Sequence, residues 1–191
     1  MGLPGGRCAN VRVKPVQTPE LDALARAESL IAVIPDYPQP GILFRDIMPL
    51  LADAAALRAT IEALIAPFTG QYDVVAGIEA RGFLLAGAAA MVEGVGLIPI
   101  RKAGKLPRPA ASVSYALEYG TAEIEAHDDL RHGARVLLLD DVLATGGTIA
   151  AARELVEKLG GSVAGTAILL ELDALGGRDI AGSDIHAVFH A

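Results

Sequence analysis

The sequence predicts an α/β fold, in which a twisted, mostly parallel sheet is flanked by helices. From residue 72 onward, short apolar runs alternate with segments of helical periodicity, an order typical of parallel strands joined by right-handed helical crossovers. The runs at residues 135–140 and 162–170 are almost continuously apolar, as expected of strands buried on both faces. A chain of 191 residues fits one domain with a sizeable core. We expect this domain to cover residues 18–191.

The first part of the chain predicts an extension, one helix and an irregular segment. Residues 1–17 show no periodicity and are expected to form a loose extension. Thr18 and Pro19 suit the cap and the first turn of a helix, which should run to Pro35 with Leu21, Leu24, Ile31 and Ile34 near one face. Four prolines within residues 35–51 disfavour regular structure there, although the segment carries apolar side chains and should pack down.

The remaining elements follow from periodicity and punctuation. Asp53 should cap a helix that ends before Pro67, with Leu57, Ile61, Leu64 and Ile65 at helical spacing. We then expect strands at residues 72–78, 96–101, 122–126, 135–140 and 162–170, and helices at residues 82–92 and 148–159.

Composition excludes several classes of protein. The net charge of −7 and the pI of about 5.0 disfavour a nucleic-acid partner, because nucleic-acid-binding domains are usually basic. The longest uncharged stretches are shorter than the roughly 20 apolar residues that cross a bilayer, and no signal peptide is recognisable, so no membrane association is expected. Cys8 is the only cysteine and suggests a reducing compartment. We therefore expect a cytoplasmic protein.

The stretch "VLLLDDVLATGGT", residues 136–148, carries the strongest functional signal. Ligands of open parallel sheets bind beyond the carboxyl ends of the strands, where Asp140 and Asp141 are expected. The following glycine turn enters a helix, and a helix N-terminus with free N–H groups suits a phosphate. Adjacent carboxylates would repel phosphate, but they can accept hydrogen bonds from sugar hydroxyls or bind a divalent metal. The pattern predicts a site for a ribose 5-phosphate group.

This stretch resembles the phosphoribosyl-diphosphate-binding motif of the type I phosphoribosyltransferases. The resemblance implies their fold, with a small N-terminal hood at about residues 30–50 and a flexible lid loop at about residues 102–118. It also implies that Asp140 and Asp141 hold the ribose hydroxyls, and that the 5-phosphate is bound by Ala144, Thr145, Gly146, Gly147 and Thr148. The alternative is an ordinary strand-to-helix turn with a chance pair of acids.

Three further stretches resemble the adenine-specific branch of this family: "PDYPQPGILFRDIMPLL", "GIEARGFLLAG" and "IRKAGKLPRPAASVSYALEYG". With the main motif, the resemblance covers about residues 30–178. The first stretch implies adenine contacts through the backbone of Leu43 and through Phe44 and Arg45. Without the resemblance, Leu43 and Phe44 would be read as core residues and Arg45 as the surface partner of Asp46.

The second stretch resembles the diphosphate loop. There Arg81 would bind diphosphate, since arginine pairs with phosphate through two N–H groups, and the Glu79–Ala80 peptide bond is expected to be cis. Ala80 stands where the family usually has a serine or threonine.

The third stretch resembles the lid, which would close on the diphosphate and exclude water. The resemblance implies that Arg101 reaches the site of a neighbouring subunit and that Lys102 and Lys105 meet diphosphate. It also implies that Glu118 lies near N7 of the purine and that Tyr119 binds substrate. Family members usually have glycine at Arg108. A solvated basic hairpin is the alternative for this charge run.

The resemblance implies Mg²⁺-dependent transfer of ribose 5-phosphate from phosphoribosyl diphosphate to adenine N9, giving AMP and diphosphate. Glu118, Asp140 and Asp141 are the expected catalytic residues. The resemblance also implies that Mg²⁺ is held mainly by the diphosphate and water, and that the protein forms a homodimer. The alternatives are a phosphoribosyltransferase for xanthine, hypoxanthine–guanine or orotate, or a nucleotide-binding regulator with this fold. The histidines, His127, His132, His186 and His190, show no metal-ligand spacing and are assigned structural or surface roles.

Overall fold

The computed structural model describes residues 19–116, 120–182 and 184–191. The expected N-terminal extension therefore lies outside the described residues. A seven-stranded sheet in the order β5-β6-β4-β3-β7-β8-β9 forms the centre of the molecule. The strands are β3 (Val74–Ile78), β4 (Gly96–Lys102), β5 (Ala111–Ala116), β6 (Thr121–Ala126), β7 (Arg135–Leu143), β8 (Ser162–Glu171) and β9 (Ile185–His190). The five strands β4, β3, β7, β8 and β9 run parallel, and the β5–β6 hairpin joins β4 antiparallel, so the predicted fold class is confirmed.

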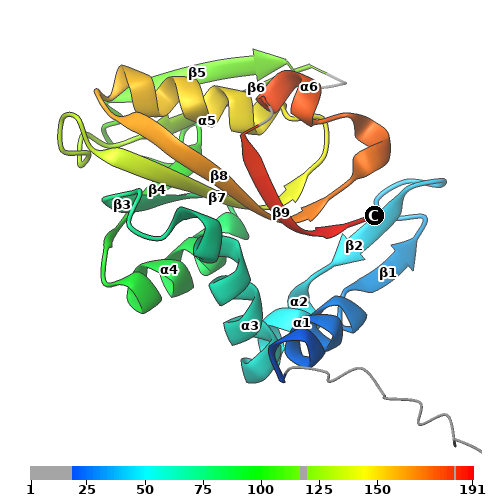
Figure 1. Ribbon diagram of the computed structural model, residues 1–191. Helices are drawn as coiled ribbons and strands as arrows, with labels where there is room; N and C mark the ends of the chain where they lie inside the picture. The colour runs from blue at the N-terminus through cyan, green and yellow to red at the C-terminus, as the bar shows by residue number, and fades with distance from the viewer. Residues whose placement is uncertain (1–18, 117–119, 183) are drawn as a thin grey trace, which may run out of the picture.

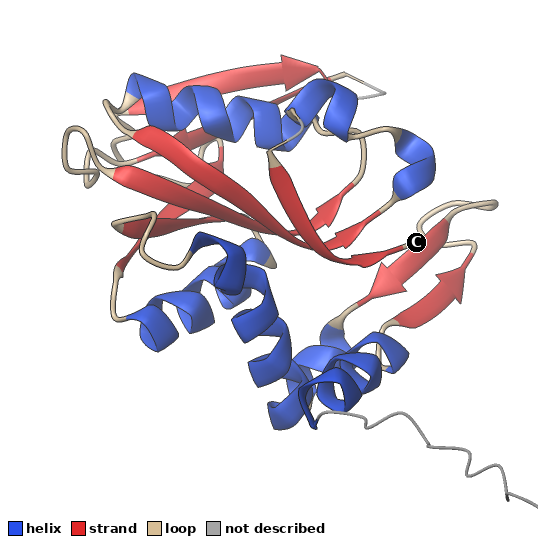
Figure 2. Ribbon diagram, in the orientation of Figure 1, coloured by secondary structure: helices blue, strands red, loops and turns tan. Residues whose placement is uncertain are grey.

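Helices cover both faces of this sheet (Figures 1 and 2). One face is covered by α3 (Ala54–Ile65) and α4 (Gly82–Glu93), and the other by α5 (Gly147–Lys158) and the short α6 (Arg178–Ala181). Two 3-10 turns, Ala66–Phe68 and Asp173–Leu175, complete the elements of this part. The sequence of β7 explains the layering, because Leu137 and Leu139 pack in the α3/α4 core whereas Val136 and Leu138 pack in the α5 core.

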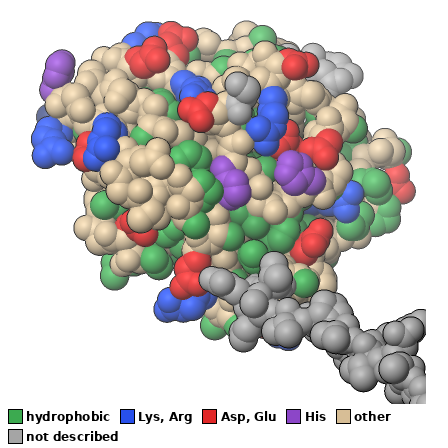
Figure 3. Space-filling model, viewed as in Figure 1, with side chains coloured by type: hydrophobic (Ala, Val, Ile, Leu, Met, Phe, Trp, Pro, Cys, Tyr) green, Lys and Arg blue, Asp and Glu red, His purple; other side chains and the backbone are tan. Residues whose placement is uncertain are grey.

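A smaller hood lies beside the carboxyl end of the sheet (Figure 1). It contains α1 (Pro19–Ser29), α2 (Met48–Ala52), and an antiparallel pair, β1 (Ala32–Pro35) with β2 (Leu43–Asp46). Figure 3 shows apolar side chains over this part of the molecule, where Val33, Tyr37 and Leu43 are about half exposed. The hood thus offers an apolar surface next to the polar edge of the sheet.

The prediction of the first helix is wrong in its second half. The observed helix α1 ends at Ser29, so Ile31 and Ile34 lie outside it. Ile34 is part of β1 and pairs with Phe44 of β2. The spacing of Ile31 and Ile34 fits a helix, but in the structure the backbone N–H and C=O groups of this segment pair with β2. The β-branched residues Val33 and Ile34 also suit a strand. The segment expected to be irregular contains β2 and α2.

The other predicted elements are present, with shifts of a few residues at their ends. Asp53 caps α3 as expected, because its carboxylate accepts hydrogen bonds from the N–H groups of Ala55 and Ala56. Besides β1 and β2, two further strands were not predicted, namely β5 within the expected lid and β9 at the sheet edge. None of the described helices combines the length and the apolar character needed to cross a membrane.

Candidate active site

The two acids of the main motif lie inside β7, near its carboxyl end, because the strand extends beyond the predicted end at residue 140. The strand continues to Leu143 because β8 pairs with it as far as Glu171. Asp140 and Asp141 are both buried, with 8% and 7% of their surfaces exposed, and Asp140 Oδ1 accepts a hydrogen bond from Asp141 N at 2.9 Å. Burial and the neighbouring Asp141 carboxylate raise the pKa of Asp140 well above the ordinary aspartate range.

Close packing of α4 on the sheet brings Arg81 to this acid pair. A side chain at Gly82 would meet Leu139 O at 2.8 Å and Asp140 Oδ1 at 3.0 Å, so only glycine allows this approach. Arg81 Nη2 then lies 2.6 Å from Asp141 Oδ2, although that oxygen accepts no hydrogen bond of good geometry among the described residues. The Glu79–Ala80 peptide bond just before it is cis, as predicted.

A cavity of about 500 Å³ opens in front of the acid pair. It brings together Asp140, Asp141, Lys102 and Thr148, which the sequence analysis selected, from β7, β4 and α5. The sequence analysis gave no ligand-binding role to three other polar residues that line it, Glu79, Tyr115 and Glu123. The polar lining of the cavity therefore combines carboxylates with a lysine and hydroxyl groups, a combination suited to a sugar phosphate.

Glu79 organises the basic side of this cavity. Its Oε2 accepts hydrogen bonds from Lys102 N at 3.0 Å and from Arg101 Nε at 3.4 Å. Arg101 Nη1 also donates to Lys105 O at 3.3 Å. Within this chain Arg101 thus lies along the edge of the site and ties Glu79 to the start of the lid.

Glu125 holds the backbone of the lid. This buried carboxylate accepts hydrogen bonds from Lys105 N at 2.9 Å and Leu106 N at 2.7 Å. Burial by itself would raise the pKa of Glu125, but the N–H groups of the lid outweigh it and lower the pKa. The side chain of Lys105 is exposed and does not line the cavity, so the structure does not bring this predicted residue to the acids.

The glycine turn is shaped by the segment that packs behind it. Gly146 has φ +83°, and a side chain there would lie 2.1 Å from Gly177 O. Gly147 begins α5, and Thr148 Oγ1 donates a hydrogen bond to Tyr115 Oη at 3.2 Å. Thr145 and Gly147 border a second hollow of about 500 Å³ between β5 and α5, also lined by Tyr115. The turn therefore contacts the lid strand on one side and the α6 segment on the other.

The hood contributes a third hollow, of about 390 Å³, beside Arg81. Phe44 lines it together with Ile34, Tyr37, Asp46 and Met48. The guanidinium carbon of Arg81 is 5.4 Å from the centre of the Phe44 ring, a cation–π distance. Phe44 is thus brought to the acid pair through Arg81.

Other predicted residues are placed differently or lie outside the described residues. Leu43 is 56% exposed. Arg45 lies on the opposite face of β2 from Phe44 and Asp46, because side chains alternate along a strand. Glu118 and Tyr119 lie outside the described residues. Alternation in "AEIEA" was a sequence signal that could have drawn attention to Glu123 and Glu125.

The sequence and the fold have clear relatives. The family model described as phosphoribosyl transferase domain matches residues 46–184. An adenine phosphoribosyltransferase of Renibacterium salmoninarum is 58% identical over 84% of this chain and 90% of its own length, and one of Clavibacter sepedonicus is 56% identical over 90% and 91%.

Solved structures agree with these relatives. The adenine phosphoribosyltransferase of Rhodothermus marinus superposes with a TM-score of 0.83 at 46% identity, covering 89% of this chain and 99% of its own. The Saccharomyces cerevisiae enzyme, solved with an imino-altritol bisphosphate and adenine, superposes with a TM-score of 0.82 at 34% identity, covering 87% and 98%. Together with the match of the family model, these similarities show that the chain belongs to the phosphoribosyl transferase domain family and, within it, to the adenine phosphoribosyltransferases.

Proposed function

We propose that this protein transfers the ribose 5-phosphate group of phosphoribosyl diphosphate to N9 of adenine, forming AMP and releasing diphosphate. The observation that carries this proposal is the single cavity in which Asp140, Asp141, Lys102 and Thr148 meet. The relatives that are 52–60% identical are named adenine phosphoribosyltransferases, which supports adenine as the base. The reaction is a step of purine salvage.

Different residues bind the hydroxyls and the 5-phosphate of the ribose in this proposal. Asp140 and Asp141 accept hydrogen bonds from the ribose hydroxyls, and they favour the positive charge that develops on the ring as the bond to diphosphate breaks. The N–H groups at the start of α5 and the hydroxyls of Thr145 and Thr148 bind the 5-phosphate. The phosphate and the acids thereby fix the reacting carbon between them.

The leaving group and the base occupy the two sides of Arg81. Lys102 and Arg81 stabilise the charge of the departing diphosphate, with Arg101 and Lys105 assisting as the lid closes. The hollow lined by Phe44 offers an apolar surface for the purine next to Arg81, and the backbone of Leu43 borders the base. The side chain of Arg45 lies on the other face of β2, outside this hollow. We assign Glu118 to the purine N7 proton and Tyr119 to the same end of the lid.

The donor set fits Mg²⁺ carried by the substrate. Magnesium prefers oxygen ligands, keeps several waters and usually bridges substrate phosphates. The carboxylates of Asp140 and Asp141 line the cavity, and Asp141 Oδ2 accepts no hydrogen bond of good geometry from the described residues. These two residues would hold the ion through water, and the bound ion would neutralise diphosphate charge. Activity should vanish with excess chelator and return with added Mg²⁺.

A homodimer is supported by an apolar surface on α4 and β4. Leu84, Met91 and Val92 of α4 are 48–84% exposed, and Leu97 of β4 is 38% exposed. Exposed apolar groups at this density favour burial against another copy. Light scattering should give twice the chain mass, and Met91→Glu should shift the protein toward monomer.

Location and domain organisation follow from the sequence. We propose a cytoplasmic enzyme with one catalytic domain at residues 18–191, supported by the single cysteine. On the face shown in Figure 3, basic and acidic side chains are interspersed. This face therefore shows no large basic patch of the kind that binds nucleic acid. Cell fractionation should place the protein in the soluble fraction.

A base panel tests the proposed function. Purified protein is incubated with phosphoribosyl diphosphate, Mg²⁺ and one of adenine, hypoxanthine, guanine, xanthine or orotate, and nucleotide is quantified. We expect AMP from adenine alone. Changing Asp140 and Asp141 together to Asn should abolish it, whereas the same change at the exposed pair Asp128 and Asp129 should not. Turnover of another base would overturn the specificity, and tight AMP binding without turnover would favour a regulator.

A further inference from the structure

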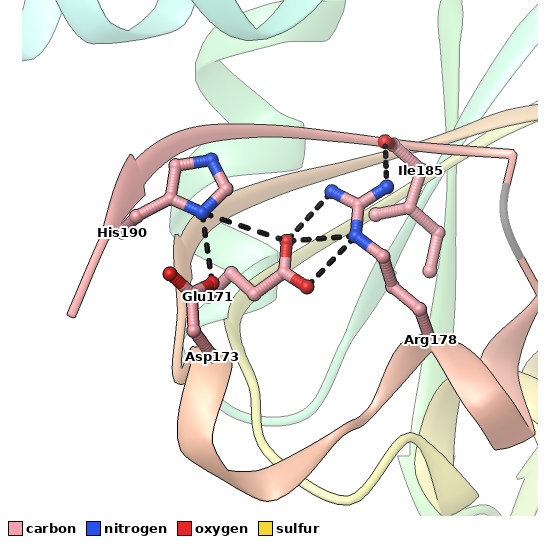
Figure 4. Close-up of polar contacts among 5 residues, drawn as sticks. All are labelled: Glu171, Asp173, Arg178, Ile185 and His190. Carbon is pink, nitrogen blue, oxygen red and sulfur yellow. Dashed lines mark hydrogen bonds and ion pairs between the residues drawn. The ribbon is translucent and has the colours of Figure 1, made fainter.

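An ion pair that the proposed mechanism does not use lies at the carboxyl end of β8 (Figure 4). Glu171 is the last residue of β8 and is buried, with 5% of its surface exposed. Both of its carboxylate oxygens accept hydrogen bonds from Arg178, the first residue of α6. Arg178 Nε lies 2.8 Å from Oε1 and 3.0 Å from Oε2, and Nη2 lies 2.6 Å from Oε2. A two-pronged pair of this kind fixes orientation as well as distance.

The remaining contacts of Arg178 and Glu171 show a closed network. Arg178 Nη1 donates to Ile185 O at the start of β9, at 2.9 Å, so the guanidinium joins β8, α6 and β9. His190 Nδ1 lies 2.9 Å from Asp173 Oδ1 and 3.9 Å from Glu171 Oε2. Glu171, Asp173 and His190 each offer an atom that could bind a metal ion, and these atoms lie within 4.8 Å of one another. Arg178 already neutralises Glu171 and occupies both of its oxygens, so the group is an ion-pair network rather than a cation site.

Gly177, immediately before Arg178, touches the proposed 5-phosphate loop. A side chain at Gly146 would lie 2.1 Å from Gly177 O and 3.1 Å from Ala181 Cβ. Conversely, a side chain at Gly177 would lie 2.4 Å from Ala144 O. The two segments therefore meet backbone to backbone, with no flexible side chain between them to absorb a displacement.

A second link joins α6 to the helix that follows the loop. Arg153 Nη1 on α5 donates to Ala181 O at 3.4 Å. The α6 segment is thus held from two directions, by Glu171 through Arg178 and by α5 through Arg153. Of these two, the Glu171 contact is the buried, two-pronged one, so it has the greater control over where Gly177 lies.

We infer that the Glu171–Arg178 pair positions the 5-phosphate loop of residues 144–148 by holding Gly177 against Gly146; this inference rests on the proposed function of that loop. Neither residue lines the cavity in front of the acid pair or the hollow beside the loop, so both are positioning residues. Phosphate binding through N–H groups depends on their direction. A small displacement of the loop therefore weakens contacts to phosphate while it leaves contacts to the base unchanged.

The experiment compares the binding of AMP and of adenosine, which lacks only the phosphate, by calorimetry. Arg178→Lys keeps the positive charge but loses the two-pronged guanidinium donor. Glu171→Gln keeps the shape of the side chain but loses the negative charge of the carboxylate. We expect each variant to weaken AMP binding by about 10-fold, equivalent to about 1.4 kcal/mol, with adenosine binding within about twofold of wild type. The KM for phosphoribosyl diphosphate should rise in parallel, with the KM for adenine unchanged.

Arg135→Lys is the matched control. Arg135 also forms a two-pronged pair, with Asp73 at 2.8 and 3.2 Å, but at the amino ends of β3 and β7. It should lower the melting temperature without changing the ratio of AMP to adenosine affinity. An unchanged ratio in whichever of Arg178→Lys and Glu171→Gln folds would overturn the inference. A wild-type protein that binds AMP no more tightly than adenosine would instead overturn the proposed function.

Discussion

Arg81 at the start of α4 and Asp141 on β7 form an ion pair, with 2.6 Å between Nη2 and Oδ2. The same guanidinium lies 5.4 Å from the ring centre of Phe44 in the hood. One side chain therefore joins the proposed ribose, diphosphate and base regions. Its charge also offsets part of the repulsion between the two buried acids of β7.

Replacing this arginine tests its bridging role. Lysine at position 81 keeps one positive charge, but its single ammonium group cannot both pair with Asp141 and form the contact over the Phe44 ring. We expect Arg81→Lys to lower kcat/KM for phosphoribosyl diphosphate by about 100-fold, a typical cost of losing one charge-stabilising donor. Steady-state kinetics measure this effect. Arg58→Lys, on the exposed Arg58–Glu62 pair of α3, is the control and should retain wild-type kinetics.

Asp140→Asn should stabilise the ligand-free protein while it reduces activity. The amide oxygen can still accept the hydrogen bond from Asp141 N, but the buried charge is gone. A gain of about 1 kcal/mol would raise the melting temperature by about 2–4 °C in a chain of this size. Asp141→Asn is the contrasting variant, because it removes the partner of Arg81, and it should not raise the melting temperature. A fall in melting temperature for Asp140→Asn would contradict the argument.

The stabilisation by Asp140→Asn should depend on pH. Because the pKa of Asp140 is raised in the folded protein, the folded state holds that proton more tightly than the unfolded chain does. Folding of the wild type is therefore penalised above the ordinary aspartate pKa of about 4, and the penalty grows as pH rises toward the folded pKa. Melting curves of wild type and variant from pH 4 to pH 8 should diverge with rising pH. Parallel curves would mean that the Asp140 charge is not the cause.

Gly146→Ala should cost more than a positive φ alone can explain. Gly133 has a similar φ of +76° with nothing within 4 Å of an added side chain, whereas at Gly146 an added carbon would lie 2.1 Å from Gly177 O. We expect Gly133→Ala to reduce the free energy of unfolding by about 1 kcal/mol and Gly146→Ala to reduce it by about 3 kcal/mol. Urea titrations measure both values. Equal costs would show that the contact with Gly177 is not rigid.

Tyr115→Phe should weaken the connection between the lid strand and the 5-phosphate loop. The Tyr115 hydroxyl accepts the hydrogen bond of Thr148 Oγ1 at 3.2 Å. Losing a neutral hydrogen bond costs about 1 kcal/mol, which corresponds to about a fivefold rise in KM for phosphoribosyl diphosphate. Ser114→Ala, a neighbouring hydroxyl on the same strand, should leave KM unchanged. If both variants match wild type, the Tyr115–Thr148 contact has no role in binding.

Much of the sheet could be predicted because its signals are local. The strands β3, β4, β7 and β8 carry their own apolar runs, β6 shows the alternation of a strand, and α3 carries both its cap at Asp53 and its periodicity. The boundary of α1 was wrong because Ile31 and Ile34 fit a helix as well as a strand, and only pairing of β1 with β2 decides between them. Strand β9 was missed because "IHAVFH" is a short edge segment, whose pairing partner β8 lies earlier in the chain.

The sequence by itself determined which chemical groups are available at the proposed ribose phosphate site. Strand, acids, glycine turn and helix start are contiguous at residues 136–148, and covalent connection keeps contiguous groups together in any fold that forms the strand and the helix. Only the tertiary structure decided which distant groups lie near them. Arg81 forms an ion pair with Asp141, Glu79 accepts a hydrogen bond from Lys102 N, and the backbone of Gly177 packs against Gly146. These contacts depend on the strand order, which places the carboxyl ends of β3, β7 and β8 side by side, and no local pattern of residues specifies that order.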